Sequence, residues 1–238
     1  MNEIHLSIII PAHNEERRLG ATLAAIGRYL EEQDFAAEAL VVDDGSGDGT
    51  VELAESFAER LPLRVIALEQ NRGKGHAVRT GMLEARGAWR LFSDADLSTP
   101  IEELDKFWSV AKKGGEVVIG SRALPESDVT VHQSWLRELM GRTFNLILRT
   151  LGLSGIRDTQ CGFKLFSAAA AEQIFAEVSV DGFAFDVEAL MLARRHGFDI
   201  REVPVKWVNS PDSKVSIVGD PLRMFWDVLR LRLRLRRR

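Results

Sequence analysis

The chain has 238 residues, of which 45% are hydrophobic and 28% are charged, and its formal net charge is −4. This composition excludes a disordered chain or a fibre and is typical of a globular protein with one large core or two small ones. The acidic balance also argues against a nucleic-acid partner, although the segment RLRLRLRRR at residues 230–238 is strongly basic.

Cys161 is the only cysteine, so an internal disulfide is excluded. No histidine pattern accompanies Cys161, which favours a buried structural thiol over a nucleophile. The N-terminus lacks the pattern of a signal peptide, and no stretch approaches the roughly eighteen apolar residues of a membrane-spanning helix. We therefore expect a cytoplasmic protein.

Short apolar runs alternate with helical patterns through the first half of the chain. Strands are expected in LSIIIPAHNE, where Pro11 stops the run, and in EALVVDDGSGDGT, RVIALEQNRGKG, AWRLFSDADL and EVVIGSR. Helices are expected in residues 15–32, in 51–61 with Thr50 as the cap, and in 101–114 after Pro100. This alternation predicts an α/β fold with a mostly parallel central sheet, flanked by helices, that binds ligands at the carboxyl ends of its strands.

Polar segments follow directly after four of these strands: NEE, DDGS, DAD and GSR. Asp94 and Asp96 are separated by one residue, and on an extended stretch they would point to the same side. Two carboxylates so close favour a cation between them, and Mg²⁺ and Mn²⁺ prefer oxygen ligands. A lone Asp-X-Asp is more often an acidic loop before a helix. A second acidic pair, Asp43 and Asp44, at another strand end favours the metal site.

Eight segments carry a family resemblance, in order from residue 7 to about residue 216. They are SIIIPAHNEERRL, VVDDGSGDGT, NRGKGHAVRTGM, FSDADLSTP, VIGSRAL, RDTQCGFKLFS, GFAFDVEAL and VPVKW with DSKVS. Together they resemble family 2 glycosyltransferases of GT-A fold, and within them the dolichyl-phosphate glucosyltransferases and dolichol-phosphate mannose synthases. The resemblance implies a GT-A domain over residues 1–216, with a nucleotide-sugar part (1–125) and an acceptor part (126–216), followed by a basic amphipathic tail (217–238).

The resemblance also implies roles for individual residues on the donor side. Pro11, His13 and Glu15 would line the nucleotide base and ribose, while Asp44 would contact the base edge. Asp94 and Asp96 would face the diphosphate and hold Mg²⁺ or Mn²⁺, and they count as catalytic for that reason. The implied donor-binding set is Pro11, His13, Glu15, Asp43, Asp44, Lys74 and Asp94. Lys74 has two readings, a ligand of a donor phosphate or a solvated turn lysine.

On the acceptor side, Arg122, Arg137 and Lys214 match positions that lipid-phosphate members use for the acceptor phosphate, and Arg122 is also expected to be catalytic. Guanidinium groups bind such oxygens in pairs. The resemblance places Asp158, Gln160 and Asp186 on the same side. Asp186 would orient sugar hydroxyls or act as a base in catalysis, and its alternative is an acidic residue in the first turn of a helix.

Two basic amphipathic stretches are candidates for contact with a membrane surface. Residues 134–153 would form a helix that faces either lipid or the core. In the tail, the alternation of Leu and Arg from Leu229 to Leu235 fits a strand, whereas Leu222, Phe225, Trp226, Leu229 and Leu233 form a helical stripe.

The expected activity is therefore that of an inverting, metal-dependent glycosyltransferase that moves a hexose from a nucleotide sugar, UDP-glucose first, to a polyprenyl phosphate at the inner membrane face. One alternative is a transferase that uses GDP-mannose, and another uses a soluble hydroxyl acceptor with Asp186 as base. A non-catalytic nucleotide-sugar or membrane-binding protein is the alternative outside enzymes.

Overall fold

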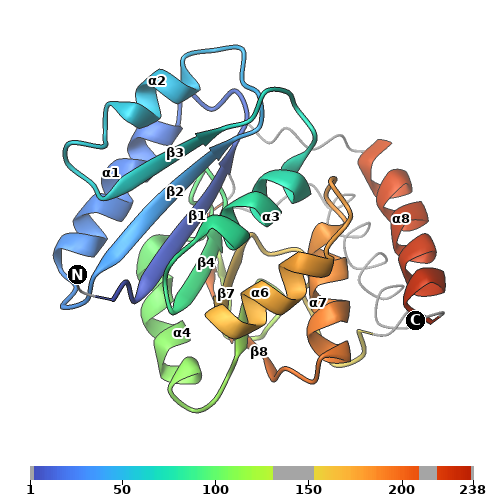
Figure 1. Cartoon of the computed structure of the whole chain (residues 1–238). Helices are drawn as coiled ribbons and strands as arrows, with labels where there is room; N and C mark the ends of the chain where they lie inside the picture. Colours follow the sequence, from blue (N-terminus) through green and yellow to red (C-terminus); the bar gives the residue numbers. More distant parts are fainter. Residues whose placement is uncertain (1–2, 131–152, 209–218, 237–238) are drawn as a thin grey trace.

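The computed structural model describes residues 3–130, 153–208 and 219–236. These residues form a seven-stranded sheet in the order β3-β2-β1-β4-β7-β5-β8, of which β1 to β4 are seen side by side in Figure 1. A separate two-stranded sheet consists of β6 and β9. The strands are β1 (Leu6–Ala12), β2 (Ala37–Asp43), β3 (Leu63–Ala67), β4 (Trp89–Ser93), β5 (Val117–Ser121), β6 (Asp128–Val129), β7 (Phe163–Ser167), β8 (Ile200–Pro204) and β9 (Lys206–Trp207).

The larger sheet is mostly parallel, as the alternation of strands and helices predicts. β1 runs parallel to β2 and β4, β2 to β3, and β5 to β8. β7 lies between β4 and β5 and runs antiparallel to both. Strands from the first and second halves of the chain therefore share one sheet.

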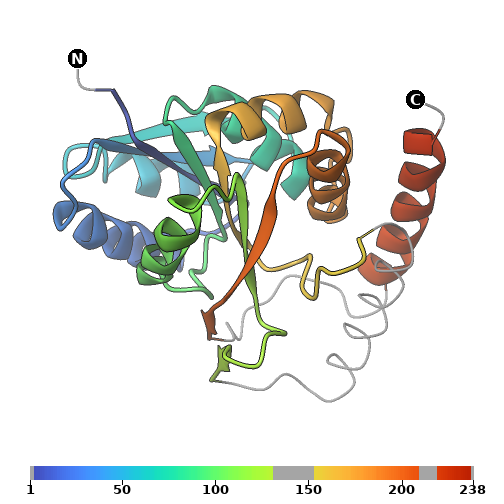
Figure 2. The same ribbon diagram turned by 90° about the horizontal axis from the view of Figure 1, so that it is seen from below.

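Helices cover both faces of the sheet (Figure 2). One face is covered by α1 (Leu19–Glu31), α2 (Thr50–Glu55) and α4 (Leu104–Ala111), the last preceded by the 3₁₀ turn η1 (Ile101–Glu103), and the other face by α3 (Lys74–Glu84), α6 (Ala168–Glu177) and α7 (Phe185–Arg195). Successive strand residues alternate between the two faces, so Ile8 packs with the first set of helices and Ile9 with the second. Both are fully buried, and each such side chain contributes about 1.5–3 kcal/mol to stability.

β1 continues through Pro11 instead of stopping there, so the sequence-based boundary is wrong. Pro11 pairs with Val42 of β2, but on the other side the pairing of β1 with β4 ends at Ile9. The missing N–H of Pro11 therefore removes no hydrogen bond from the sheet.

The helix expected in residues 51–61 is shorter, because α2 ends at Glu55 and turns follow. Thr50 is its first helical residue, not its cap. The Thr50 hydroxyl accepts a hydrogen bond from the Glu15 N–H (2.8 Å), and the Asp48 carboxylate accepts one from the Thr50 N–H (3.1 Å). The threonine thus joins the end of β1 to the start of α2.

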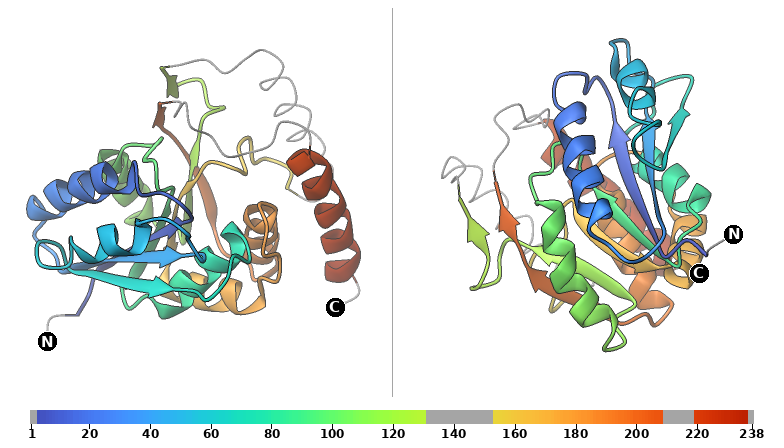
Figure 3. Two further views of the ribbon diagram at one scale, coloured as in Figure 1. Left: turned by 90° about the horizontal axis from the view of Figure 1, so that it is seen from above. Right: turned by 90° about the vertical axis from the view of Figure 1, so that its left-hand side faces the viewer.

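The tail forms a helix, α8 (Gly219–Arg236), so its reading as a strand is wrong. α8 packs beside α7 at one side of the molecule (Figure 3). Val228 and Leu231, three residues apart, are buried there, whereas Trp226 and Leu233 are each 57% exposed. None of the helices in the described residues is both long and apolar enough to cross a membrane.

Candidate active site

The carboxyl ends of β1, β2, β4 and β5 lie at one edge of the sheet, and the predicted polar segments follow them. Hydrogen bonds join these segments directly. The Asn14 N–H donates to the Ser46 hydroxyl, and the Gly47 N–H donates to the Asn14 side-chain oxygen, both at 2.8 Å. Asn14 has a φ of 55°, a left-handed conformation that asparagine tolerates better than most residues.

Lys74 contacts the Asp-X-Asp segment. It is the first residue of α3, and its Nζ lies 2.6 Å from Asp94 Oδ1. Burial lowers the pKa of Lys74, but the carboxylates of Asp94, Asp186 and Asp96 outweigh it, so the pKa lies above its ordinary value. Lys74 is therefore a charged ammonium group paired with Asp94, while its role as a ligand of a donor phosphate stays a prediction.

Asp94 and Asp96 lie in a turn and not on an extended stretch. The Leu97 N–H donates to the Asp94 carbonyl (3.1 Å), and Leu97 has a φ of 43°. Backbone strain of this kind occurs preferentially at functional sites. Asp96 accepts the Ser98 N–H at 3.0 Å and lies 3.5 Å from Arg18 Nη1, so cationic side chains approach both carboxylates.

Gly162 forms the surface against which the Asp94 carboxylate packs. A Cβ atom at position 162 would lie 1.9 Å from Asp94 Oδ2, far inside van der Waals contact. The Gly162 carbonyl also accepts the Asp94 N–H at 3.0 Å. The glycine of RDTQCGFKLFS therefore leaves the space that the carboxylate occupies.

Asp44 holds the loop that leads into α3. Its two carboxylate oxygens accept the N–H groups of Arg72 (2.9 Å) and Gly73 (2.7 Å). Gly73 has a φ of 117°, and a Cβ there would lie 2.5 Å from the Asp181 carbonyl. Asp44 thereby fixes the backbone next to Lys74, while its contact with a nucleotide base stays a prediction.

The other donor-side residues lie at the ends of β1 and β2. Asp43 accepts the Ser46 N–H at 2.9 Å and also bonds its hydroxyl, which shapes the DDGS turn. Glu15, 7% exposed, forms an ion pair with Arg18 (Nη2 to Oε1, 2.8 Å). Their roles in nucleotide binding remain predictions, as do those of Pro11, which is buried in β1, and of His13, whose Nε2 lies 3.2 Å from the Asn14 amide.

Arg122 and Asp158 form a bidentate pair at the end of β5. Arg122 Nε and Nη2 donate to the two Asp158 oxygens at 2.7 and 2.9 Å, and the Arg122 N–H adds a third bond at 3.0 Å. The Arg122 guanidinium also lies 5.5 Å from the centre of the Trp207 ring. The acceptor residue predicted from the sequence is therefore held rigidly by an aspartate from the RDTQCGF segment.

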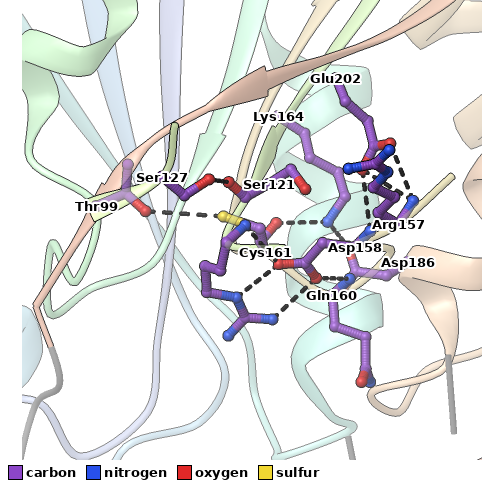
Figure 4. A network of polar contacts seen from close by, with 11 residues as sticks. Thr99, Ser121, Ser127, Arg157, Asp158, Gln160, Cys161, Lys164, Asp186 and Glu202 are labelled. Carbon is purple, nitrogen blue, oxygen red and sulfur yellow. Dashed lines mark hydrogen bonds and ion pairs between the residues drawn. The ribbon is translucent and has the colours of Figure 1, made fainter. Parts of the chain in front are cut away.

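Glu202 of β8 fixes that segment from the other side (Figure 4). Its carboxylate accepts the backbone N–H groups of Arg157 and Asp158, each at 2.9 Å. Cys161 is fully buried, and burial, with the nearby Asp158 charge, raises the pKa of its thiol to about 11. The prediction of a buried thiol is confirmed.

Asp158 gives an expected acid dependence of stability. Burial alone would raise its pKa, but Arg122 lowers it to about 2, from 3.8. A lowered folded-state pKa stabilises the protein above the unfolded value, and this stabilisation is lost as the pH falls from about 4 to about 2. Over this pH range, the free energy of unfolding of the Asp158→Asn variant should fall by about 2 kcal/mol less than that of the unchanged protein. Urea unfolding at pH values between 2 and 7 measures it, and an unchanged slope below pH 4 would contradict the assignment.

Lys164 was not predicted from the sequence. Its side chain is 1% exposed, and its Nζ contacts Asp186 Oδ1 at 2.5 Å and the Cys161 carbonyl at 2.6 Å (Figure 4). The signal in the sequence is a lysine inside the apolar strand FKLFS. Asp186 lies in the first turn of α7, and its charge acts on Lys74, while its role toward the sugar stays a prediction.

The donor set at Asp94 and Asp96 suits Mg²⁺ or Mn²⁺. Among the described residues, no group of three or more His, Cys, Asp or Glu side chains gathers as a self-contained metal cage. A magnesium-type ion needs none, because it commonly uses one or two carboxylates and completes its shell with water and substrate phosphates. Two carboxylates that share a turn at the edge of the sheet fit that pattern. The other two acceptor predictions, Arg137 and Lys214, lie outside the described residues, as do residues 134–152 of the helix expected in 134–153.

Solved structures similar to this one support the fold. Glucosyl-3-phosphoglycerate synthase from Mycobacterium tuberculosis, crystallised with uridine diphosphate, matches with a TM-score of 0.72 and 20% identity, over 96% of this chain and 80% of that one. A second crystal structure of the same enzyme contains Mn²⁺, uridine diphosphate and glucosyl-3-phosphoglycerate, with a TM-score of 0.72, 21% identity and the same coverage of both chains. Both comparisons confirm the predicted GT-A type of α/β fold.

Similar sequences identify the family. The dolichyl-phosphate beta-glucosyltransferase of Dictyostelium discoideum is 37% identical, over 98% of this chain and 76% of that protein. The human dolichyl-phosphate beta-glucosyltransferase is 36% identical, over 96% of this chain and 75% of its own length. The family model for glycosyl transferase family 2 matches residues 7–175. The resemblance found in the eight sequence segments is thus confirmed, and the chain belongs to glycosyl transferase family 2.

Proposed function

We propose that this protein is an inverting glucosyltransferase that moves glucose from UDP-glucose to a polyprenyl phosphate such as dolichyl phosphate. The observation that carries the proposal is the grouping of Asp94, Asp96 and Lys74 at the carboxyl edge of the sheet, with the Arg122–Asp158 pair on the acceptor side. The dolichyl-phosphate beta-glucosyltransferases, which match nearly the whole chain, support the choice of donor and acceptor.

The donor diphosphate would bind at Lys74. The Lys74 ammonium group lies at the start of α3, so its charge adds to the positive end of the helix dipole. Asp94 and Asp96 would hold Mg²⁺ or Mn²⁺, which when bound supplies positive charge for the diphosphate leaving group. The Asp44 carboxylate fixes the loop before α3 and so keeps Lys74 in position.

The acceptor phosphate would be oriented by Arg122. A phosphate monoester is ionised at neutral pH, so its oxygen attacks the anomeric carbon without a general base. The new bond forms between that oxygen and the anomeric carbon, while the bond from this carbon to the diphosphate oxygen breaks and UDP leaves with the electron pair. In-line attack converts an α-linked donor into a β-linked product. Asp186 would orient sugar hydroxyls in this reaction.

Nucleotide release tests the proposal. The protein is supplied with Mn²⁺ and with UDP-glucose or GDP-mannose, each with and without a short polyprenyl phosphate in detergent. We expect release that requires the lipid phosphate and prefers UDP-glucose. Preference for GDP-mannose would support a mannosyltransferase. Release that requires a soluble hydroxyl compound instead would overturn the lipid acceptor, and no release from any sugar donor would overturn catalysis.

The outward face of α8 supports a place at the membrane surface, which we propose is the cytoplasmic face. Trp226, Arg230 and Leu233 share this face at spacings of four and three residues, and all three are exposed. Trp226 and Leu233, two members of the apolar stripe predicted in the tail, are thus exposed, while Val228 and Leu231 pack inward. Exposed tryptophan and leucine beside arginine are typical of helices that lie on anionic lipid.

We expect the double variant Trp226→Ala/Leu233→Ala to bind vesicles that contain an anionic lipid at least about fivefold more weakly than the unchanged protein does. Leu83→Ala is the matched control, because Leu83 is an exposed leucine (40%) on α3, away from α8. Co-sedimentation with vesicles measures binding, and transfer to a short-chain acceptor in detergent should be unaffected. Equal binding by all three proteins would contradict the role of α8 without affecting the proposed reaction.

A further inference from the structure

The buried lysine of β7 is in an unusual environment. Lys164 is the one lysine that is 1% exposed or less among the described residues, and it lies in the middle of the sheet. An ammonium group in a protein interior is destabilising unless its charge is compensated and its N–H groups are bonded. Both conditions are met here, by the Asp186 carboxylate at 2.5 Å and the Cys161 carbonyl at 2.6 Å.

Lys164 lies close to Phe92, as Lys74 does. Lys164 Nζ lies 5.7 Å from the centre of the Phe92 ring, and Lys74 Nζ lies 5.2 Å from the same centre. The two ammonium groups therefore approach one aromatic side chain at the end of β4. The Asp186 charge acts on both lysines, and burial leaves the pKa of Asp186 above its ordinary value despite them. The Asp186 carboxylate thus bonds one lysine directly, and its charge acts on a second.

We propose that Lys164 is a positioning residue for Asp186, holding its carboxylate toward the sugar-binding side of the site. The proposal rests on the transferase activity proposed above. The Cys161 carbonyl fixes the lysine itself. The backbone around Cys161 does not depend on Lys164 in return, because the pairing of Phe163 with Ser93 and the bond from Asp94 to the Gly162 carbonyl hold it in place.

A double-mutant cycle tests this role. The variants are Lys164→Met, Asp186→Asn and their combination, measured with the donor and acceptor that the unchanged protein uses best. A residue that acts only through Asp186 gives effects that do not add. We expect each single variant to lower kcat by about a hundredfold, the double variant to be no slower than Asp186→Asn, and the KM for the donor to change less than about threefold.

Arg90→Met is the matched control for a structural effect. Arg90 is a buried cation on the adjacent strand β4, and like Lys164 it bonds one carbonyl (Met82, 2.7 Å) and one carboxylate (Glu172, 2.5 Å), but toward the opposite end of the strand from Asp94. The Arg90→Met variant should have a lower Tm than the unchanged protein, while its kcat stays within about threefold of the original value. If Lys164→Met matches Arg90→Met in kcat, or if its effect adds to that of Asp186→Asn, the proposal is wrong.

Should Lys164→Met fail to fold, Lys164→Arg replaces it in the cycle, because a guanidinium group keeps the charge. This group is larger than an ammonium group and would displace the Asp186 carboxylate, so kcat should fall by at least about tenfold. Turnover by Lys164→Arg at the original rate would overturn the proposal. An inactive unchanged protein would instead refute the proposed function, which separates the two failures.

Discussion

Asp94→Asn is expected to lower the rate of sugar transfer by about a thousandfold, equivalent to about 4 kcal/mol of transition-state stabilisation, and to remove the response to Mn²⁺. The carboxamide keeps the shape of the side chain but loses its charge. The change removes one of two candidate metal ligands and leaves the Lys74 ammonium without the carboxylate 2.6 Å away. Steady-state transfer rates over a range of Mn²⁺ concentrations measure both effects.

Asp199→Asn is the control for this variant. Asp199 forms an exposed ion pair with Arg201 (2.6 Å), and its side chain is 45% exposed. Such exposed pairs contribute little to stability, so the transfer rate and the Mn²⁺ response of the Asp199→Asn variant should match those of the unchanged protein. If Asp94→Asn keeps half of the original rate, the metal role assigned to Asp94 is wrong.

Gly162→Ala should lower the transfer rate by about a hundredfold in a protein that still folds. The added methyl group would lie 1.9 Å from Asp94 Oδ2, so either the carboxylate or the backbone of residues 161–163 must move. The carboxylate moves more easily, since β7 is paired on both sides. The effects of this displacement are measured by the transfer rate, the thermal unfolding and the Mn²⁺ binding of the variant.

Gly27→Ala is the control for this variant, because it adds the same methyl group where there is space for it. Gly27 lies in α1, and nothing lies within 4 Å of a Cβ at that position. Alanine in a helix interior is more favourable than glycine by about 0.5–1 kcal/mol, so this variant should be slightly more stable and fully active. Gly162→Ala with unchanged activity and unchanged Mn²⁺ affinity would show that the position of Asp94 does not matter.

The sequence predicts the sheet well, because hydrophobic alternation and strand-end polar residues are local signals. The grouping of Asp44 and Asp94 at one edge follows from parallel strands alone, whereas Arg122 reaches that edge because β5 joins β4 through the antiparallel strand β7. What Asp44 bonds could not be predicted, because its partners are backbone N–H groups of a distant loop. The strand boundary at Pro11 failed for a similar reason, since it depends on where the neighbouring strand ends.

Long-range ion pairs were the main gap in the prediction of the site. Lys164 and Asp186 belong to different segments of the family pattern, and only the antiparallel placement of β7 brings them together. The same holds for Arg122 and Asp158. The resemblance identified these segments as functional, but it gave no indication that Asp186 and Arg122 are each paired with a second charged side chain.

The position of β7 also delays the joining of β4 and β5 during synthesis. β4 and β5 leave the ribosome well before β7, yet the two strands meet only through it. Until residue 167 has been made, the edges of β4 and β5 that β7 later covers are unpaired and prone to aggregation, and Asp94 lacks its contact with Gly162. The joining of β4 to β5 and the contact of Asp94 with Gly162 therefore both wait for the same segment of the chain.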